Sequence, residues 1–528
     1  MGETTPSANR QIARAAGTVM FAMVFGQLAG LARSILIEHI FPAIQQDAFF
    51  AANRVSETLF TLLAAGALGS AFIPTFTTLL AKNEKASAWR LASSIANLIT
   101  LTLSMLGVIT AIFAPQIVRY ALAPGLAVDP ETFQMTFTLL RIQLIASVLF
   151  GLGGLVVGIL NAHQIFFIPQ LTIGFFRLGE IFGVLVLARW FGIYGLAWGV
   201  VLGAGLYLLI QIPTLLRQKG VYTPSLGLED PSVREVFRLM APRVLGAAVV
   251  QLNFWVNTWL ASQMADGSIA GLQYGFTLML MAQAVIAQSV AIAAMPTFSA
   301  QFALGKMDEM RTSLASTIRG VLFFALPASI GLILLRKPIV AMLYQHGGGN
   351  LDLTTMIVWA LLWYAAGLVG HSILEVLTRA FYAQHDTKTP VIVGAIAMGL
   401  NVVFSFAFSS LFVRIGWMPH GGLALANSLA TALEVTALFI IMRHRLNGIN
   451  DFYILRGGLQ TIGGTLVMSV AVILCLRLFS DRSAWLLSIG GIVAGGSVYV
   501  MMMMALRVPE LAILMGAVQS RLRGNKGS

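Results

Sequence analysis

Apolar runs of twenty or more residues recur along this chain from Ile12 to Leu506, and short polar loops separate them. A helix needs about 20 such residues to cross a bilayer. Because the lipid interior offers the backbone no hydrogen-bonding partner, a spanning segment is either a helix or part of a closed barrel. A barrel requires apolar and polar residues in alternation, and these runs lack that pattern. The sequence therefore predicts an all-α polytopic membrane protein.

The runs predict about 14 transmembrane helices, and the composition agrees with that number. Only 10% of the 528 residues are charged and 58% are apolar, whereas a soluble domain carries about 25% charged residues. The predicted spans are roughly 11–40, 47–80, 90–113, 133–160, 165–189, 192–216, 236–263, 268–300, 312–335, 353–382, 389–413, 420–442, 457–479 and 484–506.

Two halves of the chain share a sequence pattern in the same order. Residues 71–76 read AFIPTF and residues 293–298 read AAMPTF, and Pro169 corresponds to Pro390 downstream. The offset stays between 221 and 227 across four apolar segments, so the halves have like orientation. Membrane transporters are often built from such repeats, with the substrate site where the repeats meet.

This pattern divides the chain into three predicted regions. Residues 1–217 form an N-terminal six-helix repeat, and residues 218–445 form a linker and a C-terminal six-helix repeat. Residues 446–528 add two transmembrane helices and a basic cytoplasmic tail. In the linker, Asp230 and Pro231 are a typical N-cap and first helical residue. We interpret the segment that begins at Pro231 as a short interfacial helix that leads into the seventh span.

The net charge of +12 is distributed unevenly among the loops. Of the 33 Lys and Arg residues, 21 fall in alternate loops and tails, which predicts that both termini are cytoplasmic. The opposite loops hold seven: Arg119, Arg189, Arg336, Lys337, Arg414, Arg477 and Arg482. Five fall within spans: Arg33, Arg54, Arg141, Arg177 and Arg319. The basic charge therefore reflects membrane topology, and we expect no nucleic-acid partner.

Several kinds of chemistry lack their sequence signals. Cys475 is the only cysteine, which rules out a disulfide framework or a thiolate metal site. No GxxxxGK[ST] phosphate loop, HExxH or GxSxG motif occurs. The N-terminal apolar run continues into a full-length helix, so we do not expect a cleavable signal peptide. We expect no enzyme, no cofactor and no bound metal.

The first two predicted spans hold the densest set of intramembrane charges, Arg33, Asp47, Arg54 and Glu57. Asp47 and Arg54 lie about 20° apart around the second helix, and Glu57 lies about 60° further. Arg33 follows two glycines spaced four residues apart, which allow close approach of another helix. Two interpretations are open: a salt-bridge network that only fastens helices, or the wall of a polar cavity. We favour the cavity, because intramembrane charge is usually functional.

Other polar positions inside the predicted spans are weaker candidates. Asn253 and Asn257 share a face of the seventh span, and Thr277 belongs to a polar but uncharged eighth span. The pairs Arg177–Glu180 and Glu375–Arg379 have intrahelical spacing and can satisfy each other, which favours a structural role. Arg319 and Glu434 stand singly and are not assigned a role.

Several motifs together resemble one family. They are Asp47-Ala48-Phe49-Phe50 with Gly66-Ala67 and Ala71-Phe72-Ile73-Pro74, then Ala123-Pro124-Gly125, Gly158-Ile159-Leu160-Asn161 with Pro169, and Phe381-Tyr382 with Asp386 and Lys388-Thr389-Pro390. In this order they are similar to the MurJ (MviN) lipid II flippases of the multidrug/oligosaccharidyl-lipid/polysaccharide exporter superfamily. The resemblance covers spans one to twelve and implies fourteen helices.

The resemblance also implies a central cavity formed by helices one, two, seven and eight, with arginines that face a pyrophosphate. Arg33, Asp47 and Arg54 match the family's charged positions. Gln27, Phe60 and Thr277 stand where the family has arginines, and Phe276 replaces an acidic residue. Asn257 and Ser405 stand where some members have acidic sodium ligands, so the resemblance does not imply sodium coupling here.

The expected function is a flippase that moves an undecaprenyl-diphosphate-linked peptidoglycan precursor, lipid II, from the cytoplasmic to the outer leaflet of the bacterial plasma membrane. Alternating access without nucleotide hydrolysis is the expected route. The candidate substrate-binding residues are Arg33, Asp47, Arg54, Glu57, Asn257 and Thr277. The expected partners are the lipid-linked substrate and membrane lipid, with cell-wall synthesis machinery as a further candidate. The sequence does not indicate an oligomeric state.

Alternatives stay open. Within the superfamily they are a flippase for another lipid-linked oligosaccharide and a cation-coupled multidrug exporter, for which Asp47 and Glu57 would supply carboxylates. A polyprenyl-phosphate glycosyltransferase or ligase would need a long external loop, and the sequence offers none of that length. A partner protein that does not itself transport would agree with the missing arginines.

Overall fold

The computed structural model describes residues 8–62, 71–345 and 351–511, and the elements in these ranges are helical. Twelve of the described helices are long and apolar enough to cross a membrane. The two remaining predicted spans correspond to α1 (Ala8–Ile40) and to α2 (Ala43–Phe60) with α3 (Ile73–Ala81). The predicted all-α, multi-pass fold of about 14 spans is therefore confirmed.

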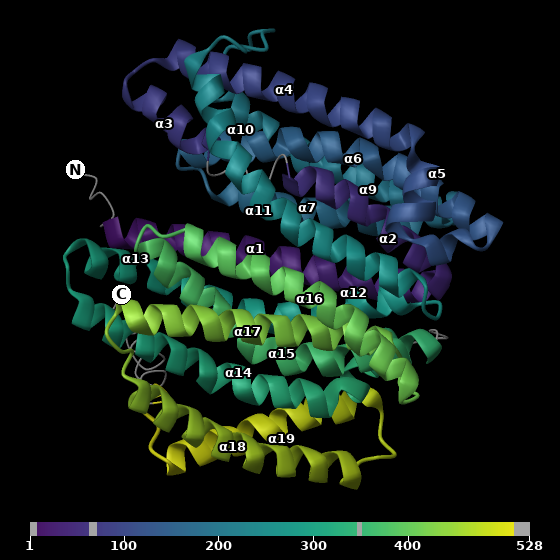
Figure 1. Ribbon diagram of the computed structural model, residues 1–528, viewed down its shortest axis with the longest axis vertical. Coiled ribbons are helices and arrows are strands. Elements are labelled where there is room, and N and C mark those ends of the chain that lie inside the picture. Colours follow the sequence, from purple (N-terminus) through teal and green to yellow (C-terminus); the bar gives the residue numbers. More distant parts are fainter. Residues whose placement is uncertain (1–7, 63–70, 346–350, 512–528) are drawn as a thin grey trace, which may run out of the picture. The chain divides into compact units, whose positions relative to one another are not determined.

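The chain divides into two compact units, residues 1–269 and 270–528 (Figure 1). Beyond the first three helices, the first unit contains α4 (Lys85–Ile112), α5 (Ala114–Gln116), α6 (Pro130–Ala162), α7 (Phe167–Phe182), α8 (Ala188–Phe191), α9 (Ile193–Leu209), α10 (Ile212–Leu216) and α11 (Pro231–Ser262). A π-helical turn at Gly183–Leu187 joins α7 to α8.

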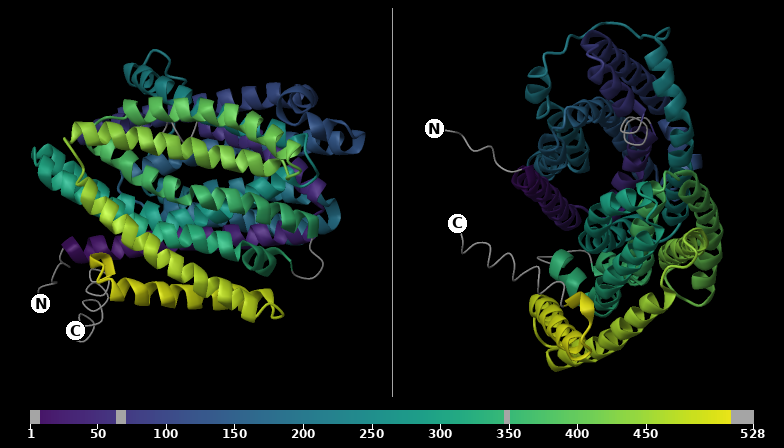
Figure 2. Two further views of the ribbon diagram at one scale, coloured as in Figure 1. Left: turned by 60° about the horizontal axis from the view of Figure 1, so that its bottom comes forward. Right: turned by 90° about the vertical axis from the view of Figure 1, so that its left-hand side faces the viewer.

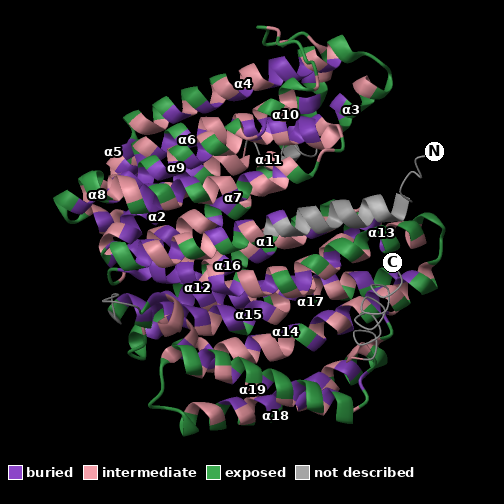
Figure 3. Ribbon diagram, turned by 180° about the vertical axis from the view of Figure 1, so that it is seen from behind, coloured by how far each residue is buried: buried purple, intermediate pink, exposed green. Residues whose placement is uncertain are grey.

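The second unit begins within α12 (Ser268–Gln283), which continues through a π-helical turn into α13 (Ser289–Ala303). It then contains α14 (Met307–Tyr344), α15 (Leu351–Ala383), α16 (Lys388–Arg414), α17 (His420–Arg445), α18 (Asp451–Leu478) and α19 (Ala484–Ala505). Figure 3 shows buried residues concentrated along α15, whereas α18 and α19 carry many exposed residues. The division into sequence repeats at residue 217 stays a prediction, because the compact units describe packing and not sequence similarity.

The linker before the seventh span differs from the expected interfacial helix. Asp230 accepts a hydrogen bond from the backbone N–H of Ser232 at 2.8 Å and starts α11, which runs on without a break to Ser262. Val233 and Val236 are buried in a core with α3 and α4 residues. The apolar face of this segment therefore packs on protein. The prediction of a separate interfacial helix is wrong.

Arg336 and Lys337, which we expected in a loop, lie within α14. The helix continues through Pro338 to Tyr344 and is 38 residues long. The polar pair interrupts the apolar run, which is why hydropathy alone ended the span too early. A helix tolerates such residues near its end because long basic side chains reach the membrane surface.

The two C-terminal helices pack against α14 (Figures 1 and 2). A core formed by Phe323, Met468 and Tyr499 joins α14, α18 and α19, and the Tyr499 hydroxyl donates to the Phe323 carbonyl at 2.6 Å. Arg319, which had no predicted partner, forms an ion pair with Glu510 just after α19. This pair connects the end of the hairpin formed by α18 and α19 to α14 of the same unit.

Replacing Arg319 with alanine is expected to lower the stability of the second unit strongly. Arg319 and Glu510 are only 4% and 11% exposed, and breaking a buried pair costs about 3–5 kcal/mol because one charge stays buried without its partner. Thermal unfolding of the purified chain in detergent measures the loss. The matched control is Arg443→Ala, which removes an exposed pair with Asp451 and should cost about 1 kcal/mol or less. Equal effects of the two variants would contradict the role of the Arg319 pair.

Asp386 fastens the connection between α15 and α16 and lies outside the spans. It accepts hydrogen bonds from the Thr389 hydroxyl at 2.6 Å and the Thr389 backbone N–H at 3.0 Å, and it pairs with Arg445 at 2.5 Å. Burial raises the pKa of Asp386, but the Thr389 hydrogen bonds and then Arg445 outweigh it and lower the pKa to about 2. The ionised carboxylate is thus the form that stabilises the fold.

The stability of the second unit is therefore expected to fall in acid through Asp386. An unfolded Asp has a pKa of about 3.9, so the contribution is complete above that pH and is lost as the pH falls through about 2. Melting temperatures between pH 6 and pH 2 should decrease less in Asp386→Asn than in the wild type. Asp451→Asn, which alters an exposed pair, is the control and should follow the wild type. Parallel curves for Asp386→Asn and the wild type would refute this contribution.

Candidate functional site

Arg33 meets α7 through a shared carboxylate. The Glu180 side chain lies 3.0 Å from Arg33 Nε and 2.8 Å from Arg177 Nη1, and Glu180 is only 2% exposed. We call Arg33, Arg177 and Glu180 the Glu180 cluster. With two guanidinium groups and one carboxylate, its formal charge is +1. A buried carboxylate between two arginines fixes both guanidinium groups in place.

Small residues explain why α1 and α7 approach closely enough for this cluster. A Cβ added at Gly26 would lie 3.4 Å from Ile173 Cγ2, and one added at Gly174 would lie 2.2 Å from the Phe25 ring. On another side of α7, a Cβ at Gly179 would lie 2.2 Å from Gly203 Cα of α9. The glycines thus allow α7 to pack tightly on both helices and hold Glu180 in position.

The sequence does not predict the ion-pair partner of Arg33. The guanidinium carbon of Arg33 approaches α2 and lies 6.0 Å from the centres of the Phe49 and Phe50 rings. Its ion-pair partner, however, is Glu180. The spacing along α7 predicts that Glu180 pairs with Arg177, but it does not predict the second pair with Arg33. The glycine spacing on α1 indicated a close helix neighbour but carried no information about which helix it is.

Arg54 and Glu57 form a second charged group on α2. Arg54 Nη1 lies 3.0 Å from Glu57 Oε2, and the guanidinium carbon lies 4.8 Å from the centre of the Phe254 ring on α11. One turn on, the Thr58 hydroxyl accepts from Trp255 Nε1 at 2.8 Å and contacts Gln251 Oε1 at 3.2 Å. A polar seam between α2 and α11 thus positions Arg54 over an aromatic face, an arrangement that arginine favours.

Asp47 lies apart from this pair and holds a turn. Its carboxylate accepts a hydrogen bond from the backbone N–H of Gly267 at 2.7 Å, and Asp47 is 2% exposed. Gly267 has a φ of 93°, which glycine adopts without strain. The charged stripe predicted on α2 therefore divides into a carboxylate that bonds to the turn after α11 and the Arg54–Glu57 pair.

The uncharged candidates make local hydrogen bonds. Asn257 Nδ2 donates to Asn253 Oδ1 at 3.2 Å on α11 of the first unit. Thr277 belongs to the second unit, where its hydroxyl donates to the Gln273 carbonyl at 2.7 Å. In the described ranges no group of three or more His, Cys, Asp or Glu residues is arranged to hold a metal ion.

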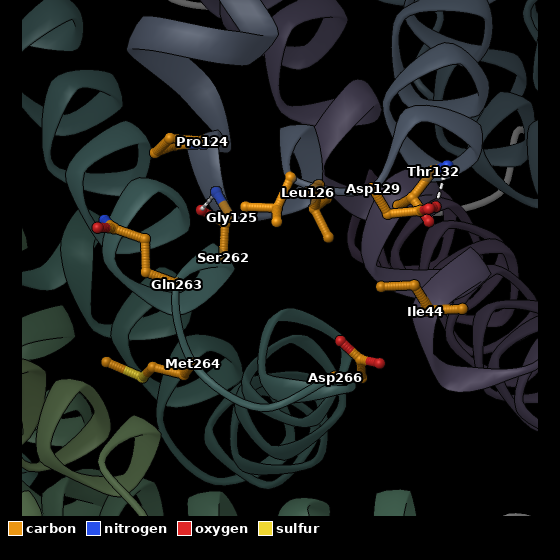
Figure 4. A pocket seen from close by; sticks show the side chains of 11 residues that line it. Ile44, Pro124, Gly125, Leu126, Asp129, Thr132, Ser262, Gln263, Met264 and Asp266 are labelled. Carbon is orange, nitrogen blue, oxygen red and sulfur yellow. Dashed lines mark hydrogen bonds between the residues drawn. The ribbon is translucent and has the colours of Figure 1, made fainter.

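One end of the first unit carries a pocket of about 720 Å³ (Figure 4). Asp129 and Asp266 line it, together with Gln263 and several apolar side chains, and no basic residue of the described chain does. A hydrogen bond from the Thr132 backbone N–H lowers the pKa of Asp129, which keeps this carboxylate ionised. Two carboxylates repel a phosphate, so this pocket does not fit a diphosphate headgroup.

The fold matches the folds of solved membrane transporters. It matches a solved structure of "Lipid II flippase MurJ, inward closed conformation" with a TM-score of 0.79 and 24% identity, over 93% of this chain and 98% of that chain. It also matches an inward-facing multidrug resistance MATE family transporter of the MOP superfamily, with a TM-score of 0.69, 15% identity and coverage of 81% and 96%. The chain therefore shares its fold with these two solved transporters.

The sequence comparisons show to which family the chain belongs. The profile of the family "Lipid II flippase MurJ" matches residues 38–489. The lipid II flippase MurJ of Burkholderia cenocepacia is 29% identical over 439 residues, which cover 82% of this chain and 84% of that protein. The chain belongs to the lipid II flippase MurJ family, as the sequence motifs indicated.

Proposed function

We propose that this chain moves lipid II from the cytoplasmic to the outer leaflet of the bacterial plasma membrane. The observation that carries the proposal is the family match across residues 38–489, which spans α2 to the beginning of α19. The twelve apolar helices support a multi-pass protein in that membrane. In this proposal the protein is a transporter and not an enzyme, and its substrate is an undecaprenyl-diphosphate-linked sugar.

The substrate's diphosphate is the group that prevents unaided crossing, because burying an unpaired charge costs many kcal/mol. We assign Arg33 and Arg54 as its ligands. Arginine stays charged and can bind phosphate oxygens bidentately. The carboxylates of Glu180 and Glu57 lie 3.0 Å from these two arginines and support the assignment by orienting them. The Glu180 cluster also keeps a formal positive charge.

The remaining candidate residues take supporting roles in the proposal. Asn257 and Thr277 supply uncharged hydrogen-bonding groups toward the sugar or peptide of the headgroup. Asp47 holds the turn that ends at Gly267 and so fixes one end of α11, the helix that carries Phe254 beneath Arg54. Glu57 orients Arg54.

Transport by alternating access then needs no nucleotide, in agreement with the missing phosphate-loop motif. With both termini cytoplasmic, as the excess of basic residues in alternate loops favours, the outward step moves an anion out of a negative interior. The membrane potential favours this step by about 2.3 kcal/mol per charge per 100 mV.

A second candidate is a flippase for another lipid-linked oligosaccharide. The observation that favours it is the side-chain chemistry at positions 60, 276 and 277. The Phe60 ring packs 5.2 Å from Phe150, and the Phe276 ring packs 5.1 Å from Tyr364. These two positions are apolar contacts, and Thr277 beside Phe276 carries no charge. In this second candidate, the headgroup is one that does not require arginines at positions 60 and 277.

Complementation tests the proposal. The wild-type chain is expressed in a bacterium depleted of its own lipid II flippase, and growth and cell shape are followed. Rescue is expected if the chain transports lipid II. A chain that inserts at normal levels without rescue would refute lipid II as the substrate. Rescue of a strain that lacks a different lipid-linked oligosaccharide flippase would then support the second candidate.

A further inference from the structure

Basic residues gather at one end of the second unit, in the region where α14 and the α18–α19 hairpin pack together. Four of the seven basic residues on the predicted outer side belong to this region: Arg336, Lys337, Arg477 and Arg482. Because the outer side of a membrane protein is usually poor in Lys and Arg, such a concentration needs a reason. Lys337 and Arg482 line one pocket of about 500 Å³.

The charges of this pocket are of one sign. In the part of the chain that the structure describes, no carboxylate lines it, and its other polar side chains are Gln345, Thr354 and Thr355. Among the described residues, neither Lys337 nor Arg482 forms an ion pair. Four arginines at the opposite end of the same unit each pair with a carboxylate: Arg311, Arg379, Arg443 and Arg445. The pocket thus offers two cations that the described protein groups do not neutralise.

The N-terminus of α19 adds to this positive field, because this helix begins at Ala484, which lines the pocket, and has no acidic residue in its first turn. The first turn of α15, by contrast, carries the carboxylate of Asp352. Ser483, the N-cap residue of α19, makes no side-chain capping hydrogen bond within the described ranges. The N-terminal end of a helix favours an anion through its dipole and its backbone N–H groups. The N-terminus of α19 therefore supports the two cationic side chains.

The remaining walls are apolar. Pro338, Ala341, Val358 and Leu487 complete the lining. Beyond the pocket, Leu486 and Ile489 of α19 are 46% and 51% exposed, so an apolar surface continues along the helix. A cationic pocket next to such a surface suits a molecule with an anionic head and a hydrocarbon tail, and basic pockets between membrane helices bind acidic lipid headgroups.

We propose that the pocket lined by Lys337 and Arg482 binds the phosphate headgroup of an anionic lipid in the outer leaflet. The ammonium and guanidinium groups contact the phosphate oxygens, and the Gln345 side chain donates a further hydrogen bond. The lipid tail lies along the exposed face of α19. This site uses none of the residues assigned to the transported diphosphate. A test of lipid binding here therefore does not depend on the proposed flippase activity.

Native mass spectrometry of the purified full-length chain tests the site. The probes are phosphatidylglycerol, phosphatidylcholine and inorganic phosphate, each titrated onto delipidated protein in detergent. The wild type is expected to retain phosphatidylglycerol in preference to phosphatidylcholine. The double variant Lys337→Gln/Arg482→Gln should bind phosphatidylglycerol at least about tenfold more weakly, because two contacts between charged side chains and the phosphate are lost.

The matched control is Arg189→Gln/Arg414→Gln, which removes two basic residues of the predicted outer side that do not line the pocket. It should keep the affinity of the wild type. Equal weakening in both double variants, or equal retention of the two lipids, would overturn the proposal. Binding of inorganic phosphate without retention of phosphatidylglycerol would also overturn it, in favour of a free phosphate.

Discussion

Replacing Arg54 with alanine is expected to abolish rescue of a flippase-depleted strain while the protein stays folded. Arg54 is 14% exposed, but its partner Glu57 is 48% exposed, and such a partly solvated pair contributes little to stability. In the transport cycle the guanidinium would make two charge-assisted hydrogen bonds to phosphate, each contributing about 1.5 kcal/mol or more. Their loss predicts a transport rate about a hundredfold lower.

Two variants control for this effect. Glu57→Gln keeps the guanidinium and should retain most of the rescue, because only the orienting charge is lost. Arg54→Lys keeps the charge but not the bidentate geometry, and should give intermediate rescue. Full rescue by Arg54→Ala at the wild-type expression level would show that Arg54 does not bind the diphosphate.

The second large effect is expected at Arg33, where stability and transport must be separated. Arg33→Ala alone should fail to rescue, but it also leaves the buried Glu180 with one arginine instead of two. The double variant Arg33→Ala/Glu180→Gln also neutralises the carboxylate, so Arg177 is left as its one charge and the formal charge of the Glu180 cluster stays at +1. It is expected to insert at the wild-type level, because Arg177 is 31% exposed and can be solvated, and still to fail to rescue, because the phosphate ligand is absent.

A matched double variant makes this test specific. Arg177→Ala/Glu180→Gln also removes one arginine and neutralises Glu180, but it keeps Arg33. It should retain transport. If both double variants rescue, the Glu180 cluster only fastens α1 to α7, which is the structural interpretation that the sequence left open. If both fail at normal stability, the assignment to Arg33 in particular is contradicted.

The helical fold was predictable because lipid imposes one rule on every span. Apolar length and the need to satisfy the backbone act locally, so each run could be assigned without knowing its neighbours. The predicted helix boundaries are wrong where a helix packs on protein or continues past polar residues. The segment that begins at Pro231 is predicted as a membrane-surface helix, but its Val233 and Val236 pack on α3 and α4. Likewise, Arg336 and Lys337 ended a run in the sequence while the helix continued to Tyr344.

The candidate site was harder to predict, because periodicity gives angles around one helix but not the partners of that helix. Asp47 and Arg54 share a face of α2, yet Asp47 bonds to Gly267 and Arg54 pairs with Glu57. The ion pair between Arg33 and Glu180 joins residues 147 positions apart in the sequence. Only packing determined by glycines on α1 and α7 brings them together, and a single sequence does not encode that pairing in any local pattern.

The central claim is that this chain transports lipid II, and outer-leaflet exposure of lipid II tests it most directly. Cells depleted of their own flippase and converted to spheroplasts would express the chain, and a membrane-impermeant reagent would label headgroups at the surface. We predict labelling near the level given by the native flippase with the wild-type chain, and background labelling with Arg54→Ala. Background labelling with the wild-type chain, inserted at the same level, would contradict the account.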